Sequence, residues 1–200
     1  KILNTILNNY LKSQKGKKPK ICNREITQKI ETILKSVRSY TNWKVVDTDN
    51  PEDLLLCGTE VASCLNVNWD VFHNKNLLAY LIDGKNRLIA IKDQTGRIRA
   101  RCILRLFWDD KNNTPVLFQE KKYYHLGIIN SDFEKALDIM CLKRAKKLKL
   151  PLLSSNKNGK VYQGTIKSLG GIAPYEYADA TYEMRQTNKP YEIIVAYLQN

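Results

Sequence analysis

Hydrophobic and polar residues alternate with period two along residues 97–108, R-I-R-A-R-C-I-L-R-L-F-W. Successive side chains of a β-strand point to opposite faces, so the alternation predicts a strand with two unlike faces. One face is apolar and consists of Ile98, Ala100, Cys102, Leu104, Leu106 and Trp108. The other face is rich in arginine and consists of Arg97, Arg99, Arg101, Ile103, Arg105 and Phe107. The apolar face marks the core.

A helix start lies before this strand. Asn50 is a good N-cap residue, Pro51 suits the first helical position, and the acidic residues that follow suit the helix dipole. The pattern predicts a helix that runs to about Leu65, after a short strand at residues 43–48.

A tight turn predicts a hairpin partner for the arginine-bearing strand. Residues 87–93, R-L-I-A-I-K-D, have the composition of a strand. The stretch D-Q-T-G that ends at Gly96 fits a type I turn followed by a glycine bulge. Residues 87–93 and 97–108 are therefore expected to pair antiparallel.

The next elements are a strand and one long helix. Residues 116–125 predict a continuous strand. Ser131 and Glu134 form a capping box, which predicts that a helix begins there and continues until Pro151 ends it. Residues 152–154 predict a short strand.

The C-terminal part predicts a loop and a hairpin. Residues 156–171 are rich in glycine and polar residues and are expected to form a loop. Residues 175–180 and 191–198 are expected to pair antiparallel, with a polar connection at residues 185–189.

Charge and apolar patterning indicate two regions and an anionic partner. Residues 1–40 predict a basic helical extension or connector, and residues 41–200 predict the core domain. The net charge of +13 favours acyl-CoA, nucleic acid or an anionic surface as partner. No stretch has the ~18–20 apolar residues that a transmembrane helix needs.

The cysteines bear on the compartment and on metal binding. Their number is odd and no two of them are spaced C-x-x-C, which argues against a disulfide framework and a zinc site. No metal is expected, and the expected location is the cytoplasm or another reducing compartment. The cysteines are Cys22, Cys57, Cys64, Cys102 and Cys141.

The order of these elements indicates an α+β fold with a mixed, mostly antiparallel sheet, because the strands cluster before one long helix instead of alternating with helices. From about Trp43 to Leu198, this order resembles the GNAT acyltransferase superfamily. In that family a long strand makes backbone contacts to acyl-CoA, and the loop that follows it holds the pyrophosphate at a helix N-terminus.

The resemblance implies an acyl-CoA-dependent N-acyltransferase within a larger protein. Its pyrophosphate loop corresponds to H-L-G-I-I-N-S, with one glycine where the family has two, so a degenerate transferase is included in the prediction. The cofactor-binding residues that it implies are Gly127, Ile128, Asn130 and Ser131. The implied acid and base are Glu120 and Tyr177, with Tyr175 as an alternative.

Three stretches also resemble uncharacterised domains in large proteins of intracellular bacteria. They are L-L-A-Y-L-I-D-G-K-N-R-L-I-A-I-K-D, A-R-C-I-L-R-L and S-L-G-G-I-A-P-Y-E-Y-A-D-A. This resemblance implies an effector-like or multidomain context, with other domains of a parent protein as partners and delivery into a host cell as one route. It implies no activity.

A cysteine nucleophile is an alternative source of catalysis. Cys64, His125 and then Asn156 or Asp179 follow one another in the order used by papain-like enzymes. Cys64 lies near the predicted C-terminus of its helix, whereas a helix N-terminus would favour the thiolate.

A non-catalytic basic module is the second alternative. Arg99, Arg101 and Arg105 would lie ~6.5–7 Å apart along their strand, a spacing that suits bidentate binding of phosphates. The competing interpretation is a structural face, paired with Asp93 and Glu120 on neighbouring strands and partly covered by a helix.

Overall fold

The computed structural model describes residues 43–68, 71–126, 131–173, 176–180, 183–187 and 191–199. The chain divides into two units, Lys1–Thr41 and Asn42–Asn200. The predicted helical extension at residues 1–40 lies outside the described residues. Among the residues described, no helix is both long and apolar enough to span a membrane.

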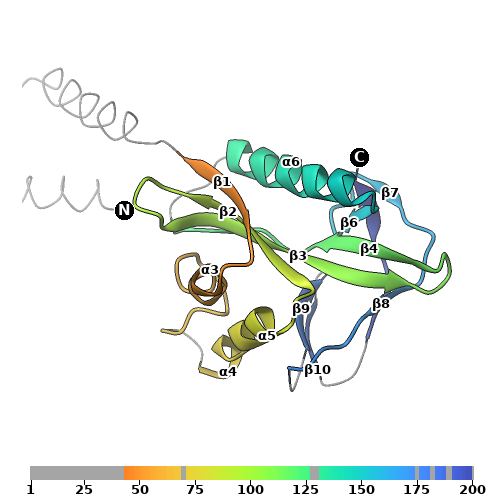
Figure 1. Cartoon of the computed structure of the whole chain (residues 1–200), viewed down its shortest axis with the longest axis horizontal. Helices are drawn as coiled ribbons and strands as arrows, with labels where there is room; N and C mark the ends of the chain where they lie inside the picture. Colours follow the sequence, from red (N-terminus) through yellow and green to blue (C-terminus); the bar gives the residue numbers. More distant parts are fainter. Residues whose placement is uncertain are drawn as a thin grey trace, which may run out of the picture. The chain divides into compact units, whose positions relative to one another are not determined.

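The second unit contains helices and strands in the following order (Figure 1). They are β1 (Lys44–Thr48), α3 (Pro51–Leu56), α4 (Val71–Asn74), α5 (Asn76–Ile82), β2 (Asn86–Lys92), β3 (Ile98–Asp109), β4 (Thr114–Gln119), β5 (Tyr123–Tyr124), α6 (Ser131–Leu148), β6 (Leu152–Ser154), β7 (Lys160–Val161), β8 (Ile166–Ser168), β9 (Glu176–Ala180), β10 (Glu183–Thr187), β11 (Glu192–Ile193) and β12 (Tyr197–Gln199).

The main sheet has the strand order β1-β2-β3-β4-β6-β12-β7. Strands β1 to β4 form an antiparallel meander, and β4 pairs with β6 in parallel. A parallel pair needs a crossover connection, and α6 provides it. The predicted α+β class with a mixed, mostly antiparallel sheet is therefore confirmed.

Helices cover both faces of this sheet (Figure 1). On one face, α6 packs on the predicted apolar face of β3, which is confirmed for Ala100, Cys102 and Leu104. Ile98 differs, because the register between β2 and β3 shifts at Lys92 and Ile98 packs on the opposite side. The second face is covered by α3, α5 and the segment that contains β9.

Helix α3 begins as predicted and ends earlier than predicted. The Asn50 side chain accepts hydrogen bonds from the backbone N–H of Glu52 and Asp53 at 2.9 and 3.3 Å. The helix ends at Leu56 instead of Leu65, and turns follow it. These turns bring Leu65 so close to Gly58 that a Cβ there would lie 2.6 Å from the Leu65 carbonyl oxygen. A continuous helix would keep these residues apart.

The strand predicted at residues 116–125 is interrupted. Its two parts, β4 and β5, both pair with β3, through Leu104–Gln119 and Arg101–Tyr123. Between these pairs, residues 120–122 lie opposite two residues of β3. One extra residue on one strand is a β-bulge, which bends the strand and increases its twist. The correction matters for the site, because the bulge lies at the end of β4 where β6 also ends.

The C-terminal strands pair differently from the prediction. β9 pairs with β10, which occupies most of the predicted polar connection. β11 pairs with β8, and β12 pairs with both β6 and β7, so the predicted loop at residues 156–171 contains two strands. Two residues separate β9 from β10 in the sequence, and closing so short a connection costs less entropy than pairing with a distant segment.

Candidate functional site

A cavity of about 310 Å³ lies where β4 and β6 stop pairing. The last pair of these parallel strands is Gln119 with Ser154. Beyond it, β4 continues into the bulge and β6 continues into a loop, and the cavity lies between them. Its lining consists of Gln119, Glu120, Lys121, Lys122, Tyr124, Glu134, Ser154, Ser155 and Asn156.

Helix α6 is tied to the bulged strand at two levels beside this cavity. The Tyr124 hydroxyl donates a hydrogen bond to Glu134 Oε1 at 3.0 Å. One turn later on the helix, Asp138 accepts from Gln119 Nε2 at 2.8 Å and from Lys122 Nζ at 2.7 Å. These contacts hold the first turns of α6 against the mouth of the cavity.

Tyr124 and Glu134 form a hydrogen-bonded pair in this lining. Glu134 is exposed and Tyr124 is half-buried. Burial raises the pKa of Tyr124, and its hydrogen bond to the Glu134 carboxylate raises the pKa further. Tyr124 therefore keeps its proton and acts as a donor that orients Glu134.

Glu120, the predicted base, belongs to the interior. Its side chain has an exposure of 0% and accepts from Arg105 Nε at 2.7 Å. It also accepts from the Tyr80 hydroxyl at 3.2 Å and from the Asp179 backbone N–H at 3.3 Å. Because these donors occupy both carboxylate oxygens, Glu120 holds the bulge and β9 together.

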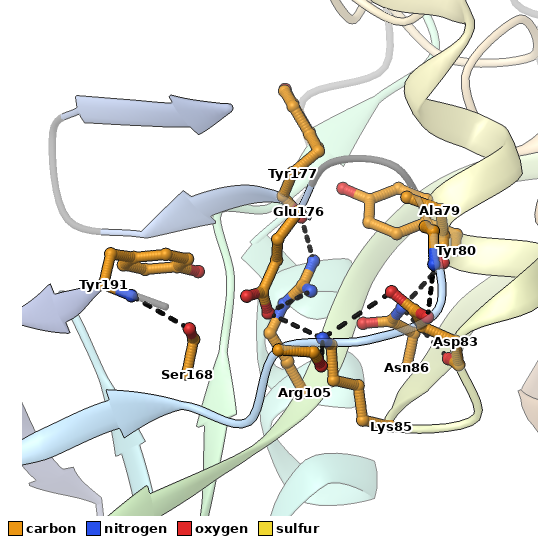
Figure 2. Close-up of polar contacts among 12 residues, drawn as sticks. Ala79, Tyr80, Asp83, Lys85, Asn86, Arg105, Ser168, Glu176, Tyr177 and Tyr191 are labelled. Atoms are coloured by element: carbon orange, nitrogen blue, oxygen red, sulfur yellow. Dashed lines mark hydrogen bonds and ion pairs between the residues drawn. The ribbon is translucent and has the colours of Figure 1, made fainter. Parts of the chain in front are cut away.

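Arg105 extends this arrangement into a buried chain of alternating charges (Figure 2). Its Nη1 lies 3.4 Å from Glu176 Oε1, and its Nη2 donates to the Tyr177 carbonyl. Lys85 Nζ lies 2.9 Å from Glu176 Oε1 and 3.6 Å from Asp83 Oδ2. Burial alone would lower the pKa of Arg105, but the Glu120 carboxylate and the neighbouring tyrosines together raise it by more, so the guanidinium stays charged.

The other two predicted anion ligands are also engaged by the protein. Arg101 is buried, donates from Nε to the Cys57 carbonyl at 3.1 Å, and stacks 4.5 Å from the centre of the Tyr123 ring. Arg99 Nη2 lies 2.6 Å from Asp93 Oδ2. Arg101 and Arg105 are therefore covered by the protein and Arg99 is paired with Asp93, in line with the structural interpretation weighed from the sequence.

Tyr177 lies outside the cavity lining. Tyr177 is buried on the α5 side of the sheet, and its hydroxyl lies 3.1 Å from Cys64 Sγ. Burial raises the pKa of Tyr177, and the contact with Cys64 adds to the shift. His125 Nδ1 lies 3.0 Å from the Glu60 carbonyl oxygen. Asn156, which the sequence offers as the third residue of the cysteine-nucleophile scheme, lines the cavity.

The predicted pyrophosphate loop lies largely outside the described residues. Gly127, Ile128 and Asn130 belong to that part, and Ser131 is the exposed first residue of α6. No group of three or more His, Cys, Asp or Glu side chains that could hold a metal occurs in the part of the chain that the structure describes.

Sequence reasoning missed Tyr124, Glu134 and Asp138 as site residues. The signal was present, because Glu134 and Asp138 are four apart and therefore lie on one face of a helix. The sequence places Glu134 in a capping box, and in the structure its side chain accepts a hydrogen bond from the Tyr124 hydroxyl. The bulge, which places Tyr124 opposite the helix, left no mark in the hydrophobic pattern.

No family model matches the chain, and no curated protein matches it. Among solved structures, the chain is similar to a ribosomal-protein-alanine N-acetyltransferase from Brucella melitensis biovar Abortus 2308. The identity is 11%, the TM-score is 0.43, and the match covers 55% of this chain and 76% of that protein. It is also similar to a transcriptional regulator from Bacillus halodurans C-125, with 13% identity, a TM-score of 0.44 and coverage of 56% and 79%.

Proposed function

We propose that the cavity between β4 and β6 binds the thioester end of an acyl-CoA, and that the protein transfers the acyl group to an amine. The observation that carries this proposal is the bulge at residues 120–122, which borders the cavity beside the first turns of α6. Bulges are frequent next to active sites, where they redirect strands and side chains.

Three further features favour an anionic, phosphorylated ligand here. The cavity lies at the carboxyl ends of two parallel strands, a common place for ligands in open sheets. The N-terminal end of α6 lies beside it, and the dipole of a helix favours negative charge at that end. Lys121 in the lining adds positive charge.

The backbone of the bulged strand offers one hydrogen-bonding group to a pantetheine-like arm. The Lys121 N–H donates to the Asp179 carbonyl at 3.4 Å, and the Tyr124 carbonyl accepts from the Ala62 N–H at 2.9 Å. The first bond is longer than an ordinary N–H···O bond, so a ligand carbonyl could replace it. The second is of ordinary length. A pantetheine-like arm would therefore hydrogen-bond to the bulged strand only at the end of the arm that lies in the cavity.

An acyl-CoA would supply an acyl group activated as a thioester. In this proposal Glu134 accepts the proton that the amine nitrogen loses as it bonds to the carbonyl carbon. The carbon–sulfur bond breaks, and CoA leaves as the thiolate, which takes up a proton from solvent. Tyr124 holds the Glu134 carboxylate in place through its hydroxyl. Glu120 keeps the bulge in position and moves no proton.

Thermal shift with acetyl-CoA tests binding, because a ligand that binds only the folded state raises its stability. Thiol release in the presence of a panel of primary amines tests transfer. We expect Glu134→Gln to keep the thermal shift and to lower transfer by ~10²-fold or more. The matched control is Glu52→Gln, an exposed glutamate in the first turn of α3, which should leave both unchanged.

Two results would contradict the proposal. One is the absence of a thermal shift at millimolar acetyl-CoA. The other is full transfer activity in the Glu134→Gln variant. This result would reject the role of Glu134, whereas acyl-CoA binding would still be judged from the thermal shift.

The alternative of a basic module that binds through β3 has little support. Its three arginines are covered or paired with carboxylates, as the contacts above describe. A module of this kind would have to use other basic side chains.

A further inference from the structure

Two buried thiols face each other between the sheet and α6. Cys102 of β3 and Cys141 of α6 lie with 3.7 Å between their Sγ atoms, and both residues have an exposure of 0%. Both are free cysteines in the apolar cluster beneath the helix. The two cysteines are 39 positions apart in the sequence, so the fold brings them together.

We propose that Cys102 and Cys141 are a site of reversible modification, where a two-electron thiol oxidant forms an intramolecular disulfide that links β3 to α6. Since an S–S bond is about 2.0 Å long, the sulfurs need to approach by about 1.7 Å for the bond to form. The inference is independent of the proposed acyl transfer.

The reaction with diamide, a diazene, shows how atoms and electrons balance. One thiolate adds to the N=N bond, and the second sulfur then attacks the first. The S–S bond forms as the S–N bond breaks, and the diazene takes up two electrons and two protons to become a hydrazine.

The surroundings of this pair disfavour the thiolate form of Cys141. The hydrogen bond with Cys102 raises the pKa of Cys141, and burial raises it further. The thiolate is the reactive form, so oxidation is slow near neutral pH and accelerates as the pH rises.

The pair is connected to the cavity through Gln119. Gln119 Nε2 lies 3.7 Å from Cys102 Sγ and 2.8 Å from Asp138 Oδ1, three residues before Cys141 on α6. Gln119 lines the 310 Å³ cavity and also a neighbouring cavity of about 490 Å³. Moving Cys102 Sγ toward the helix therefore changes a contact of a residue in both cavities.

Peptide mapping tests the proposal on the wild-type protein. After treatment with diamide and blocking of free thiols, trypsin should release C-I-L-R, residues 102–105, joined to A-L-D-I-M-C-L-K, residues 136–143, with two hydrogen masses lost. Cys57 and Cys64 should remain alkylated, because Cys57 Sγ contacts the Leu54 carbonyl and Cys64 Sγ contacts the Tyr177 hydroxyl.

Variants and a second readout sharpen the test. Cys102→Ala and Cys141→Ala should each abolish the cross-linked peptide, whereas Cys64→Ala should leave it unchanged. In the wild-type protein, oxidation should raise the melting temperature and shift the side-chain amide resonance of Gln119 but not that of Gln199, which bonds to the Asn156 and Tyr197 carbonyls.

Three outcomes would overturn the inference. They are a first cross-link between other cysteines, a disulfide-linked dimer in place of the internal link, and oxidation of Cys102 and Cys141 only after denaturation. Each is read from the wild-type chain, so the result stands even if a variant fails to fold.

Discussion

Arg105 and Glu120 form an ion pair inside the protein, with 2.7 Å between Nε and Oε1 and side-chain exposures of 1% and 0%. The pair joins the middle of β3 to the first residue after β4. Since Glu120 also accepts from the backbone of Asp179, it ties the bulge to β9. Two residues that seemed candidates for binding and catalysis thus contribute to the architecture around the cavity.

Replacing the two buried arginines of β3 by methionine should have unequal effects. Arg105→Met leaves Glu120 and Glu176 without that partner and should lower the free energy of unfolding by about 3–5 kcal/mol. Arg101→Met removes a cation that makes no ion pair with a described carboxylate. It should lower the free energy of unfolding by about 1 kcal/mol. Urea unfolding measures both changes in stability. Equal losses would contradict the different roles assigned to Arg105 and Arg101.

Asp93 should make stability depend on pH in the acid range. Burial alone would raise the pKa of Asp93, but hydrogen bonds from Thr95 and Arg99 outweigh it and lower the pKa to about 2. An unfolded Asp has a pKa of about 3.9, so the contribution is present above about pH 4 and is lost as the pH falls toward 2. The carboxyl carbon resonance of Asp93 reports the titration directly, and a midpoint near the unfolded value would refute this.

Gly164→Ala should be destabilising, because a Cβ at this position would meet Asp109 Oδ2. That carboxylate is a buried acceptor for the Tyr162 hydroxyl at 2.7 Å and for the Thr165 N–H, through its other oxygen, at 2.9 Å. We expect a loss of about 1–3 kcal/mol in urea unfolding. Gly84→Ala is the matched control, since no atom lies within 4 Å of its added Cβ, and it should change the unfolding midpoint little.

Asp138→Ala should loosen the start of α6 from the bulged strand. It removes the acceptor for Gln119 Nε2 and Lys122 Nζ, two contacts that hold the helix beside the cavity. Amide hydrogen exchange in the first turns of α6 should become faster, because local opening costs less there. Lys135→Ala, an exposed change on the same helix, serves as control. Unchanged exchange in the Asp138 variant would show that apolar packing alone positions the helix.

The parts of the fold that the sequence predicted well depend on local interactions. The N-cap at Asn50, the turn before β3 and the start of α6 at Ser131 depend on residues within a few positions of one another. Their energetics are therefore visible in a short stretch of sequence. The same holds for the apolar face of β3, because period two is a property of the strand itself.

Tertiary structure decided what these elements do together. From the sequence, the arginine face of β3 could be a structural face paired with neighbouring carboxylates or a site for an anion. In the structure, α3, α5 and β9 cover Arg101 and Arg105, and Glu120 and Glu176 pair with Arg105. The bulge at residues 120–122 depends on the register of two strands, and the approach of Tyr124 to Glu134 depends on a helix crossing above them. The sequence by itself determined the start of α3, the hairpin of β2 and β3, the start of α6 and most of the apolar face of β3. Only packing between distant segments decided which charges are paired and where a cavity opens, because those energies arise from contacts that no local pattern encodes.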